Sequence, residues 1–308
     1  MHFPQSLKHA LAAAAASLLV AVSFWTVPVQ AEAPPAPALW KLTDADSEVW
    51  IFGTIHILDP TLSWHSHIVN EAFNKAETLV LEAPALETPP AEIQKLVMKY
   101  AMNPAGITLS SLLSEESNQK LIEVLESFGL SEAQAVDTKR QFEPLRPWFV
   151  GLQLASMQAQ SRGADPKAGV ENILTEAAKD ANKPISFLET FEQQLLFFVN
   201  LSQEKASQML EDGLVQMLEQ PDLLDSLVKD WVAGNADQVG KTLQDAMDDP
   251  VIYEALLTNR NQDWARQIKT IMDGSGTYFI AVGTGHLVGK GSLQDFLLLH
   301  GLEAARIQ

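Results

Sequence analysis

Short apolar runs near the beginning of the chain predict a pair of strands. Residues 39–42 and 49–52 are apolar, and the turn-rich tetrad 44–47 separates them. Two such runs around a polar turn are typical of a β-hairpin. We therefore expect paired strands where the folded part of the chain begins.

Further apolar runs predict the rest of a sheet. Residues 78–81 form a continuous apolar run that includes β-branched side chains, which is typical of a strand buried on both faces. Residues 185–188 and 278–282 have the same character. The pattern also predicts helices over residues 68–75 and 293–299 and a last edge strand over residues 304–307.

Between these strands the sequence is mostly helical. Apolar side chains recur at helical spacing through residues 91–181 and again through residues 191–272. Strands therefore cluster at both ends of the chain. This distribution predicts the α/β fold class, with a central sheet built from both ends of the chain and a large helical insertion or cap over about residues 91–272. One domain over residues 32–308 would contain both parts.

The N-terminal residues have the pattern of a secretory signal. Lys8 and His9 precede an apolar run over residues 10–27, and Val29-Gln30-Ala31 ends it with side chains that a signal peptidase accepts. The run approaches the length of a spanning helix, so a retained membrane anchor is the alternative. The Pro/Ala linker that follows favours cleavage. This predicts a signal peptide over residues 1–31, a periplasmic or secreted protein of a Gram-negative bacterium, and no stable membrane insertion after cleavage.

Composition excludes several classes of function. The chain has no cysteine, which excludes disulfides, a lipoprotein anchor, a thiol nucleophile and cysteine-based zinc sites. Its net charge of −18 argues against binding nucleic acid or anionic lipid through charge. The remaining partners are peptides and small molecules.

Two Gly-Thr-x-His turns lie near opposite ends of the chain, at residues 53–56 and 283–286. Each follows an apolar strand. The glycines, Gly53 and Gly283, are expected to break the strand with a positive φ, and the threonine can hold the turn. His56 and His286 would then project from the carboxyl ends of strands, which is the edge where open α/β sheets bind ligands.

Two other predicted strands run into an acid, Glu82 and Glu189. If the four strands are parallel neighbours, these two acids converge with His56 and His286. Imidazoles and carboxylates together suit a divalent transition metal such as manganese, cobalt or zinc. One carboxylate would remain as a general base for the attack of water. Each residue alone is more simply a solvated turn residue, but the repeated motif with two acids favours a site.

Two more charged residues have alternative interpretations. Arg260 lies on a predicted helix before the last core strand, where it could bind a substrate carboxylate or an oxyanion. It could equally form a structural ion pair with a site glutamate. Glu171 is interpreted as a helix-start residue, and an acid that supports the site is the alternative.

The sequence resembles the TraB/GumN-type family, which includes the animal Tiki proteins, over nearly all of its length after the signal. Paired Gly-x-x-His elements with a glutamate and an arginine carry the resemblance, in segments 39–40, 52–56, 79–82, 169–171, 187–190, 259–261 and 282–289. The resemblance implies an α/β fold related to erythromycin esterase and ChaN-like proteins. Tiki proteins are described as metal-dependent peptidases, and some plasmid-encoded members limit a signalling peptide.

Residues and resemblance together predict an exported metal-dependent hydrolase that activates water. A peptidase is the leading interpretation, with a peptide or a small molecule as substrate. The alternatives are a metal-assisted esterase and a non-catalytic peptide-binding or signal-limiting protein, because nothing in the helical middle identifies a substrate. The expected catalytic residues are Glu82, Glu189 and Arg260, and the expected metal ligands are His56, His286, Glu82 and Glu189.

Overall fold

The computed structural model describes residues 34–84 and 87–308. The predicted signal peptide over residues 1–31 lies outside the described residues. Within the described part, no helix has the length and apolar character needed to cross a membrane.

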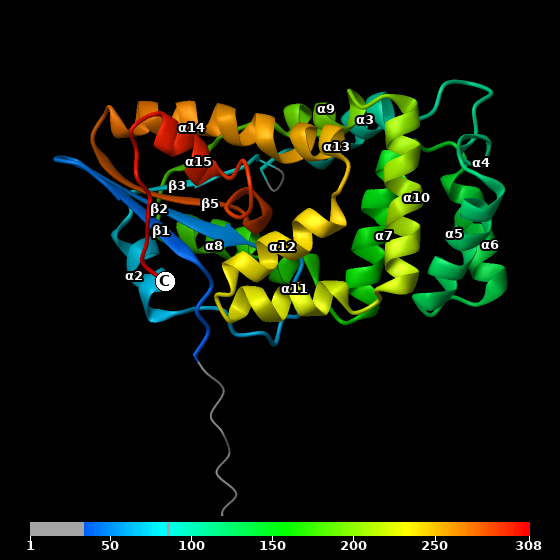
Figure 1. The fold of residues 1–308 in the computed structure, drawn as a ribbon, viewed down its shortest axis with the longest axis horizontal. Coiled ribbons are helices and arrows are strands. Elements are labelled where there is room, and N and C mark those ends of the chain that lie inside the picture. The colour runs from blue at the N-terminus through cyan, green and yellow to red at the C-terminus, as the bar shows by residue number, and fades with distance from the viewer. Residues whose placement is uncertain (1–33, 85–86) are drawn as a thin grey trace, which may run out of the picture. The chain divides into compact units, whose positions relative to one another are not determined.

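A six-stranded sheet forms the centre of the fold, in the order β4-β3-β5-β2-β1-β6 (Figure 1). The four strands from β4 to β2 are parallel, and β1 and β6 complete one side in antiparallel pairing. Both ends of the chain contribute, so the predicted α/β class with a sheet assembled from both termini is confirmed. The strands are β1 (Leu39–Thr43), β2 (Ser47–Thr54), β3 (Thr78–Leu81), β4 (Ile185–Phe187), β5 (Gly276–Gly283) and β6 (Ala305–Arg306).

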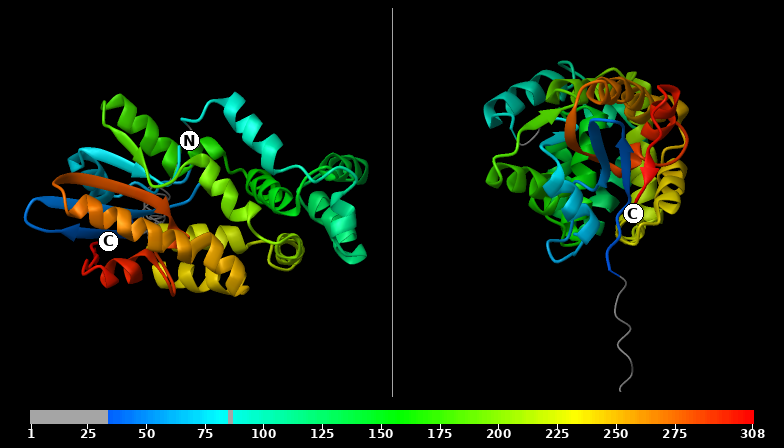
Figure 2. Two further views of the ribbon diagram at one scale, coloured as in Figure 1. Left: turned by 90° about the horizontal axis from the view of Figure 1, so that it is seen from above. Right: turned by 90° about the vertical axis from the view of Figure 1, so that its left-hand side faces the viewer.

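Helices connect the parallel strands and cover the sheet. Helix α14 lies over one face, and α2 and α8 lie over the other (Figures 1 and 2). The helices next to the sheet are α2 (His67–Lys75), α8 (Val170–Asp180), α11 (Leu223–Val232), α12 (Ala236–Ala246), α14 (Asn259–Met272) and α15 (Leu293–Leu299). Helix α9 (Phe191–Val199) shares a hydrophobic cluster with Leu96 and Trp148, and α13 (Pro250–Tyr253) precedes α14. Short 3-10 helices lie at η1 (Pro166–Ala168) and η3 (Thr284–His286), and a π-helical turn lies at η2 (Glu254–Thr258).

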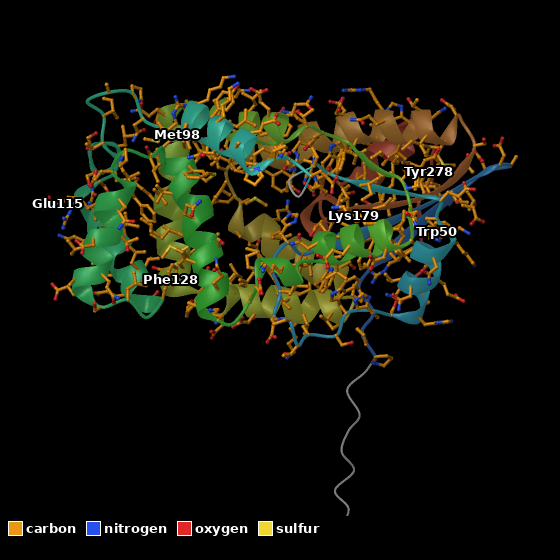
Figure 3. The ribbon with its side chains drawn as sticks, turned by 180° about the vertical axis from the view of Figure 1, so that it is seen from behind. Trp50, Met98, Glu115, Phe128, Lys179 and Tyr278 are labelled. Atoms are coloured by element: carbon orange, nitrogen blue, oxygen red, sulfur yellow. The ribbon has the colours of Figure 1, made fainter. Side chains whose placement is uncertain are left out.

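The remaining helices pack on one another at the end of the molecule that the parallel strands point toward. Glu115 and Phe128 belong to this helical cap and lie far from Trp50 and Tyr278 of the sheet (Figure 3). The cap has hydrophobic clusters of its own, separate from the cluster around the sheet. Its helices are α3 (Pro90–Tyr100), α4 (Leu109–Leu112), α5 (Glu115–Ser127), α6 (Glu132–Phe142), α7 (Pro147–Ser161) and α10 (Gln203–Glu219).

Helix-start chemistry in the sequence sets several of these boundaries. The Ser114 hydroxyl accepts from the Ser117 N–H at the start of α5, and Ser131 forms a capping box with Gln134 at the start of α6. Such caps satisfy N–H groups that have no partner inside the helix. These two serines therefore determine where α5 and α6 begin.

An aromatic cluster supports the strand that carries the first Gly-Thr-x-His turn. Phe52 of β2 packs on Trp64 and Phe279 with ring centroids 5.8 Å apart, and on Trp231 at 6.4 Å. Trp231 Nε1 also donates to the Gly53 carbonyl at 2.8 Å. Truncating a buried aromatic side chain costs about 3–5 kcal/mol. Contacts within the protein, by packing and by a hydrogen bond, thus fix the end of β2 without a bound ligand.

Candidate functional site

The four parallel strands end level with one another at one edge of the sheet. Thr54 at the end of β2 is opposite Gly283 of β5, and Leu81 of β3 is opposite both Ala281 of β5 and Phe187 of β4. The residues that follow these strand ends are His56, Glu82, Glu189 and His286. The structure therefore places all four predicted site residues at the same edge, as parallel neighbours require.

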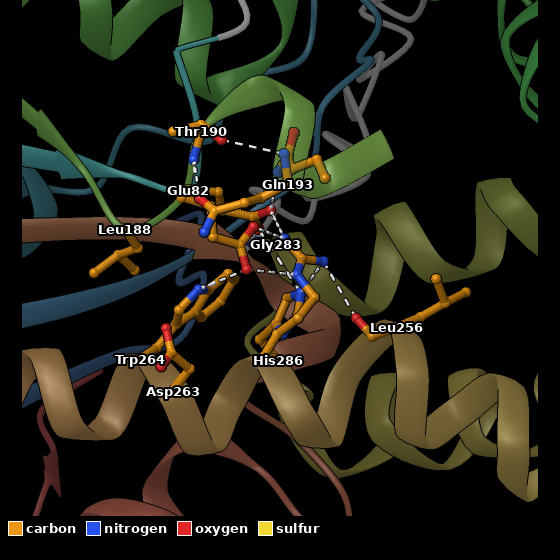
Figure 4. Close-up of polar contacts among 12 residues, drawn as sticks. Glu82, Leu188, Thr190, Gln193, Leu256, Asp263, Trp264, Gly283 and His286 are labelled. Carbon is orange, nitrogen blue, oxygen red and sulfur yellow. Dashed lines mark hydrogen bonds and ion pairs between the residues drawn. The ribbon is translucent and has the colours of Figure 1, made fainter. Parts of the chain in front are cut away.

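Glu82, Gly283 and His286 lie close together at this edge (Figure 4), and Arg260 contacts Glu82, Glu189 and His286. Its Nε and Nη2 donate to the two oxygens of Glu189 at 3.0 and 2.9 Å, and Nη2 also donates to Glu82 Oε2 at 2.7 Å. Its Nη1 donates to the Leu256 carbonyl at 3.2 Å and lies 3.0 Å from His286 Nε2. These contacts use all five N–H groups of the guanidinium. Arg260 therefore has no donor left for a substrate, and of its two interpretations the structure favours the ion pair.

Glu189 and Glu82 differ in how they are held. Trp264 Nε1 donates to Glu189 Oε1 at 2.9 Å, so Trp264 and Arg260 together cover this carboxylate. Burial raises the pKa of Glu189, and Arg260 opposes that effect. Glu82 receives the Gly283 N–H on Oε1 at 2.6 Å. Burial opposes the ionisation of Glu82, but the charges of His286 and Arg260 outweigh it and lower its pKa to about 2.

His286 is buried and fixed by two neighbours. Its Nδ1 lies 2.6 Å from Asn261 Oδ1, and its Nε2 faces Arg260. Because an amide oxygen only accepts, we assign the proton to Nδ1 and the lone pair to Nε2. Burial lowers the pKa of His286 to about 3, and Arg260 acts in the same direction. The ring is therefore neutral at physiological pH.

His56 lies on the outer side of the site, with its side chain 64% exposed. Its Nδ1 is 2.8 Å from Glu171 Oε1, and the Thr54 hydroxyl also contacts that carboxylate. Glu171 raises the pKa of His56 above its ordinary value. Glu171 lies in the first turn of α8, as its interpretation as a helix-start residue requires. It also orients His56, so both interpretations describe it.

The two motif glycines are needed for space, and the expected positive φ is wrong. Neither Gly53 nor Gly283 has a positive φ, and Gly283 has φ −52° and ψ 134°. A Cβ on Gly53 would lie 2.8 Å from Thr284 Oγ1. A Cβ on Gly283 would lie 3.2 Å from Glu82 Oε1, 3.5 Å from His56 Nε2 and 3.8 Å from His286 Cδ2. Glycine is therefore needed at position 53 because the two turns approach closely, and at position 283 because three polar side chains lie next to it. Neither position needs glycine for its backbone conformation.

Comparison with known proteins identifies the family of the chain. The model of the TraB/PrgY/gumN family matches residues 38–306. The chain belongs to the TraB/PrgY/gumN family. It is 26% identical over 261 residues to the uncharacterized protein YbaP of Escherichia coli K12, which covers 85% of this chain and 92% of that protein. It is also 26% identical to YbaP of Shigella flexneri, over 80% of this chain and 86% of that protein. No solved structure matches.

The site of this TraB/PrgY/gumN protein adjoins a cavity of about 280 Å³. Leu81 and Phe187 contribute apolar walls to it, and the polar residues that line it are His56, Glu82, Glu87, Glu171, Asn172, Thr175 and Gln194. A cavity with apolar walls and convergent polar groups is typical of a binding site for a small molecule or for part of a larger ligand.

No three His, Asp or Glu side chains among residues 34–84 and 87–308 are arranged so that, as they stand, they could hold a metal ion. The position of Arg260 explains this. Its guanidinium lies between Glu82, Glu189 and His286, and His286 Nε2 is 3.9 Å from Glu82 Oε1. The structure thus brings the four predicted residues to one edge, but it inserts an arginine among three of them.

Sequence reasoning missed the roles of Asn261 and Trp264. Both follow Arg260 on α14, and they hold His286 and Glu189. The π-helical turn η2 immediately precedes them, and its Leu256 carbonyl accepts from Arg260. Such turns are frequent at functional sites. The segment Asn259-Arg260-Asn261, which carried part of the resemblance, was the available signal.

Gly283→Ala is expected to impair the site and to spare the fold. The added methyl group would enter the space between His56, Glu82 and His286, while Gly283 φ and ψ are acceptable for alanine. We expect at least a tenfold loss of any ligand or metal affinity, and a change in unfolding free energy of about 1 kcal/mol or less. Gly213→Ala in the middle of α10 is the control, because a Cβ there meets nothing within 4 Å. Equal ligand binding by Gly283→Ala and Gly213→Ala would contradict the assignment of a binding site to the space between His56, Glu82 and His286.

Acid is expected to destabilise the protein through His286 and Glu82. Both groups have a lower pKa in the folded chain than in the unfolded chain, from 6.5 to about 3 and from 4.5 to about 2. Their stabilising contributions are complete above pH 6.5 and are lost as the pH falls through these ranges. One extra proton bound by the unfolded state gives a slope of about 1.4 kcal/mol per pH unit. Urea unfolding between pH 7 and pH 4 should show this slope, flattened in His286→Gln and unchanged in His300→Gln, where the histidine is exposed.

Proposed function

We propose that this protein is a hydrolase that cleaves an acyl bond, with a peptide as the leading substrate class, and that it uses a divalent transition metal (manganese, cobalt or zinc). One observation carries the proposal. His56 Nε2, Glu82 Oε1 and the ring of His286 all lie within 4 Å of one point beside Gly283, at the edge of the sheet and next to the cavity.

The types of donor at this point suit such a metal, and an ion bound there would displace the Arg260 N–H from His286 Nε2. The Nδ1 atoms of His56 and His286 are each held by an oxygen, from Glu171 and Asn261. Metal-binding histidines typically have this arrangement, because the hydrogen bond fixes the ring and leaves Nε2 as the donor atom. Glu82 adds an ionised carboxylate, and only a glycine at position 283 leaves the space open. His56 Nε2, His286 Nε2 and Glu82 would therefore hold the ion.

The other polar residues act by positioning these three. Arg260 holds Glu82 ionised and fixes its orientation, and Glu189 and Trp264 fix Arg260 in turn. Asn261 keeps His286 in the tautomer with a free Nε2 lone pair. When bound, a divalent metal would polarise a substrate carbonyl and lower the pKa of a water molecule.

A non-catalytic peptide-binding function is the second candidate, and one contact favours it. Arg260 Nη1 lies 3.0 Å from His286 Nε2, so the arginine and a metal ion would compete for one lone pair. If the arginine keeps that lone pair, the edge remains a polar binding surface without a Lewis acid.

A substrate screen with controlled metal content tests the proposal. The protein is stripped with a chelator, supplied separately with Mn²⁺, Co²⁺ or Zn²⁺, and incubated with a pool of randomised decapeptides and with a panel of fluorogenic esters. We expect new peptide termini in mass spectra only when a metal is present, and much less product from Gly283→Ala. Cleavage of esters alone would assign an esterase. Peptide binding without product under any metal would overturn the hydrolase and favour the binder.

Export is a further part of this proposal, because the N-terminal segment has the pattern of a cleaved signal. We expect the protein isolated from a Gram-negative host to begin near Glu32 and to be found in the periplasmic fraction. N-terminal mass spectrometry checks this. An intact Met1 in the membrane fraction would contradict it.

A further inference from the structure

The strand β4 has an unpaired side, and its hydrogen-bond pattern shows which groups face outward. The Leu79 N–H donates to the Pro184 carbonyl, and the Leu188 N–H donates to the Leu81 carbonyl. With Leu79 opposite Ile185 and Leu81 opposite Phe187, this parallel ladder turns both backbone groups of Ser186 toward β3. The N–H and C=O groups of Ile185 and Phe187 must therefore face away from the sheet.

Nothing in the described part of the chain pairs with that side of β4. The strand is the last in the sheet order and lies at the edge of the sheet (Figure 2). Its residues are exposed or half-buried, whereas the residues of β3 next to it are mostly buried. An edge of this kind presents backbone donors and acceptors to another extended chain. β4 has only three residues and follows Pro184, which limits pairing between copies of the sheet itself.

The free edge is continuous with the candidate site. Phe187 contributes backbone groups to the edge, and the same residue lines the cavity that His56, Glu82 and Glu171 enclose. A chain paired with β4 would lie about 4.8 Å from it, beside the mouth of this cavity. Every second side chain of that chain would then face the cavity side of the sheet.

We propose that the substrate is an extended peptide that binds along β4 as an additional strand, held by the backbone of Ile185 and Phe187. This proposal rests on the hydrolase function and names its substrate class. Strand addition requires alternating N–H and C=O groups in the ligand, which a peptide has and a simple ester lacks. Backbone pairing supplies affinity with little dependence on sequence, and the apolar walls formed by Leu81 and Phe187 select one side chain.

Proline and alanine at position 187 separate the backbone donor from the ring. Phe187→Pro removes the outward N–H, and Phe187→Ala keeps it, while both lose the aromatic side chain. The ladder to β3 does not use that N–H, so both variants should fold. We expect the KM or Kd for decapeptides from the randomised pool to be about tenfold higher in Phe187→Pro than in Phe187→Ala, the effect of one lost hydrogen bond. Equal values in two folded variants would overturn the proposal.

Hydrogen exchange tests the binding mode without hydrolysis. The metal-free protein is mixed with the randomised decapeptide pool, and exchange at single amides is followed by NMR or by fragmentation mass spectrometry. We expect slower exchange at Ile185 and Phe187, and no change at Ser186, whose N–H is already paired. Protection in this experiment, combined with no cleavage of the same peptides by the metal-supplied protein, would retain this binding mode and reject the hydrolase. Cleavage without protection would do the reverse, and neither protection nor measurable peptide binding would also overturn the proposal.

Discussion

Replacing His56 or His286 with alanine is expected to abolish metal binding and to lower hydrolysis at least about 100-fold. His56 Nε2 and the ring of His286 lie within 4 Å of the same point beside Gly283, and each ring is held there through Nδ1. Loss of either leaves too few donors for a stable site, so the double variant should be no worse than either single variant. Titration calorimetry with Mn²⁺ measures metal binding, and a peptide-cleavage assay measures hydrolysis.

A third histidine supplies the control for this prediction. His67 is 84% exposed and pairs only with Glu71 on α2. His67→Ala should bind metal and cleave peptides like the unaltered protein. Thermal unfolding of each variant separates loss of the site from loss of the fold, and this matters most for the buried His286. Full activity in folded His56→Ala would refute the assignment of that residue.

Arg260→Met is expected to destabilise the protein by about 3–5 kcal/mol at pH 7, because it leaves Glu82 and Glu189 buried beside each other without a counter-charge. Methionine retains much of the packing against Trp264 and Phe197, on which the guanidinium stacks. The lost charge and hydrogen bonds therefore dominate the effect. Hydrolysis should also fall, since Glu82 loses the charged donor among the groups that orient it.

The direction in which the stability deficit of Arg260→Met changes with pH shows whether the two uncompensated carboxylates cause it. Without Arg260, burial and mutual repulsion should raise the folded pKa values of the two carboxyls above their unfolded values. Their penalty is then absent at low pH and grows as the pH rises, so the deficit of Arg260→Met should shrink between pH 7 and pH 4. Arg266→Met on the same helix removes only an exposed pair with Asp263 and should change stability by about 0.5 kcal/mol or less. A deficit that grows on acidification would contradict this explanation.

The edge of the sheet was predictable from sequence because it depends on local features. Apolar runs that end in Gly-Thr-x-His or in a glutamate mark strand ends, and parallel pairing brings strand ends together. The α/β class and the family followed from these segments. The helical middle was less well resolved, because periodicity predicts helices without showing which ones pack on the sheet and which ones form the cap.

The interior of the site was not predictable, because it depends on tertiary contacts. Arg260 reaches Glu82 and Glu189 across more than 70 positions, and only the packing of α14 on the sheet shows that all its donors are used. Glycine at a strand end suggested a left-handed turn, whereas the structure uses Gly53 and Gly283 for close approach. Spacing in the sequence does not distinguish these two uses of glycine.

The central claim is that His56, Glu82 and His286 hold a divalent metal beside Gly283. The most direct measurement is an anomalous difference map from crystals soaked in Mn²⁺, recorded at a wavelength where manganese scatters anomalously. We predict one strong peak per chain, within bonding distance of His56 Nε2, His286 Nε2 and a Glu82 oxygen. A map without a peak at this edge, with Arg260 still against His286 Nε2, would contradict it.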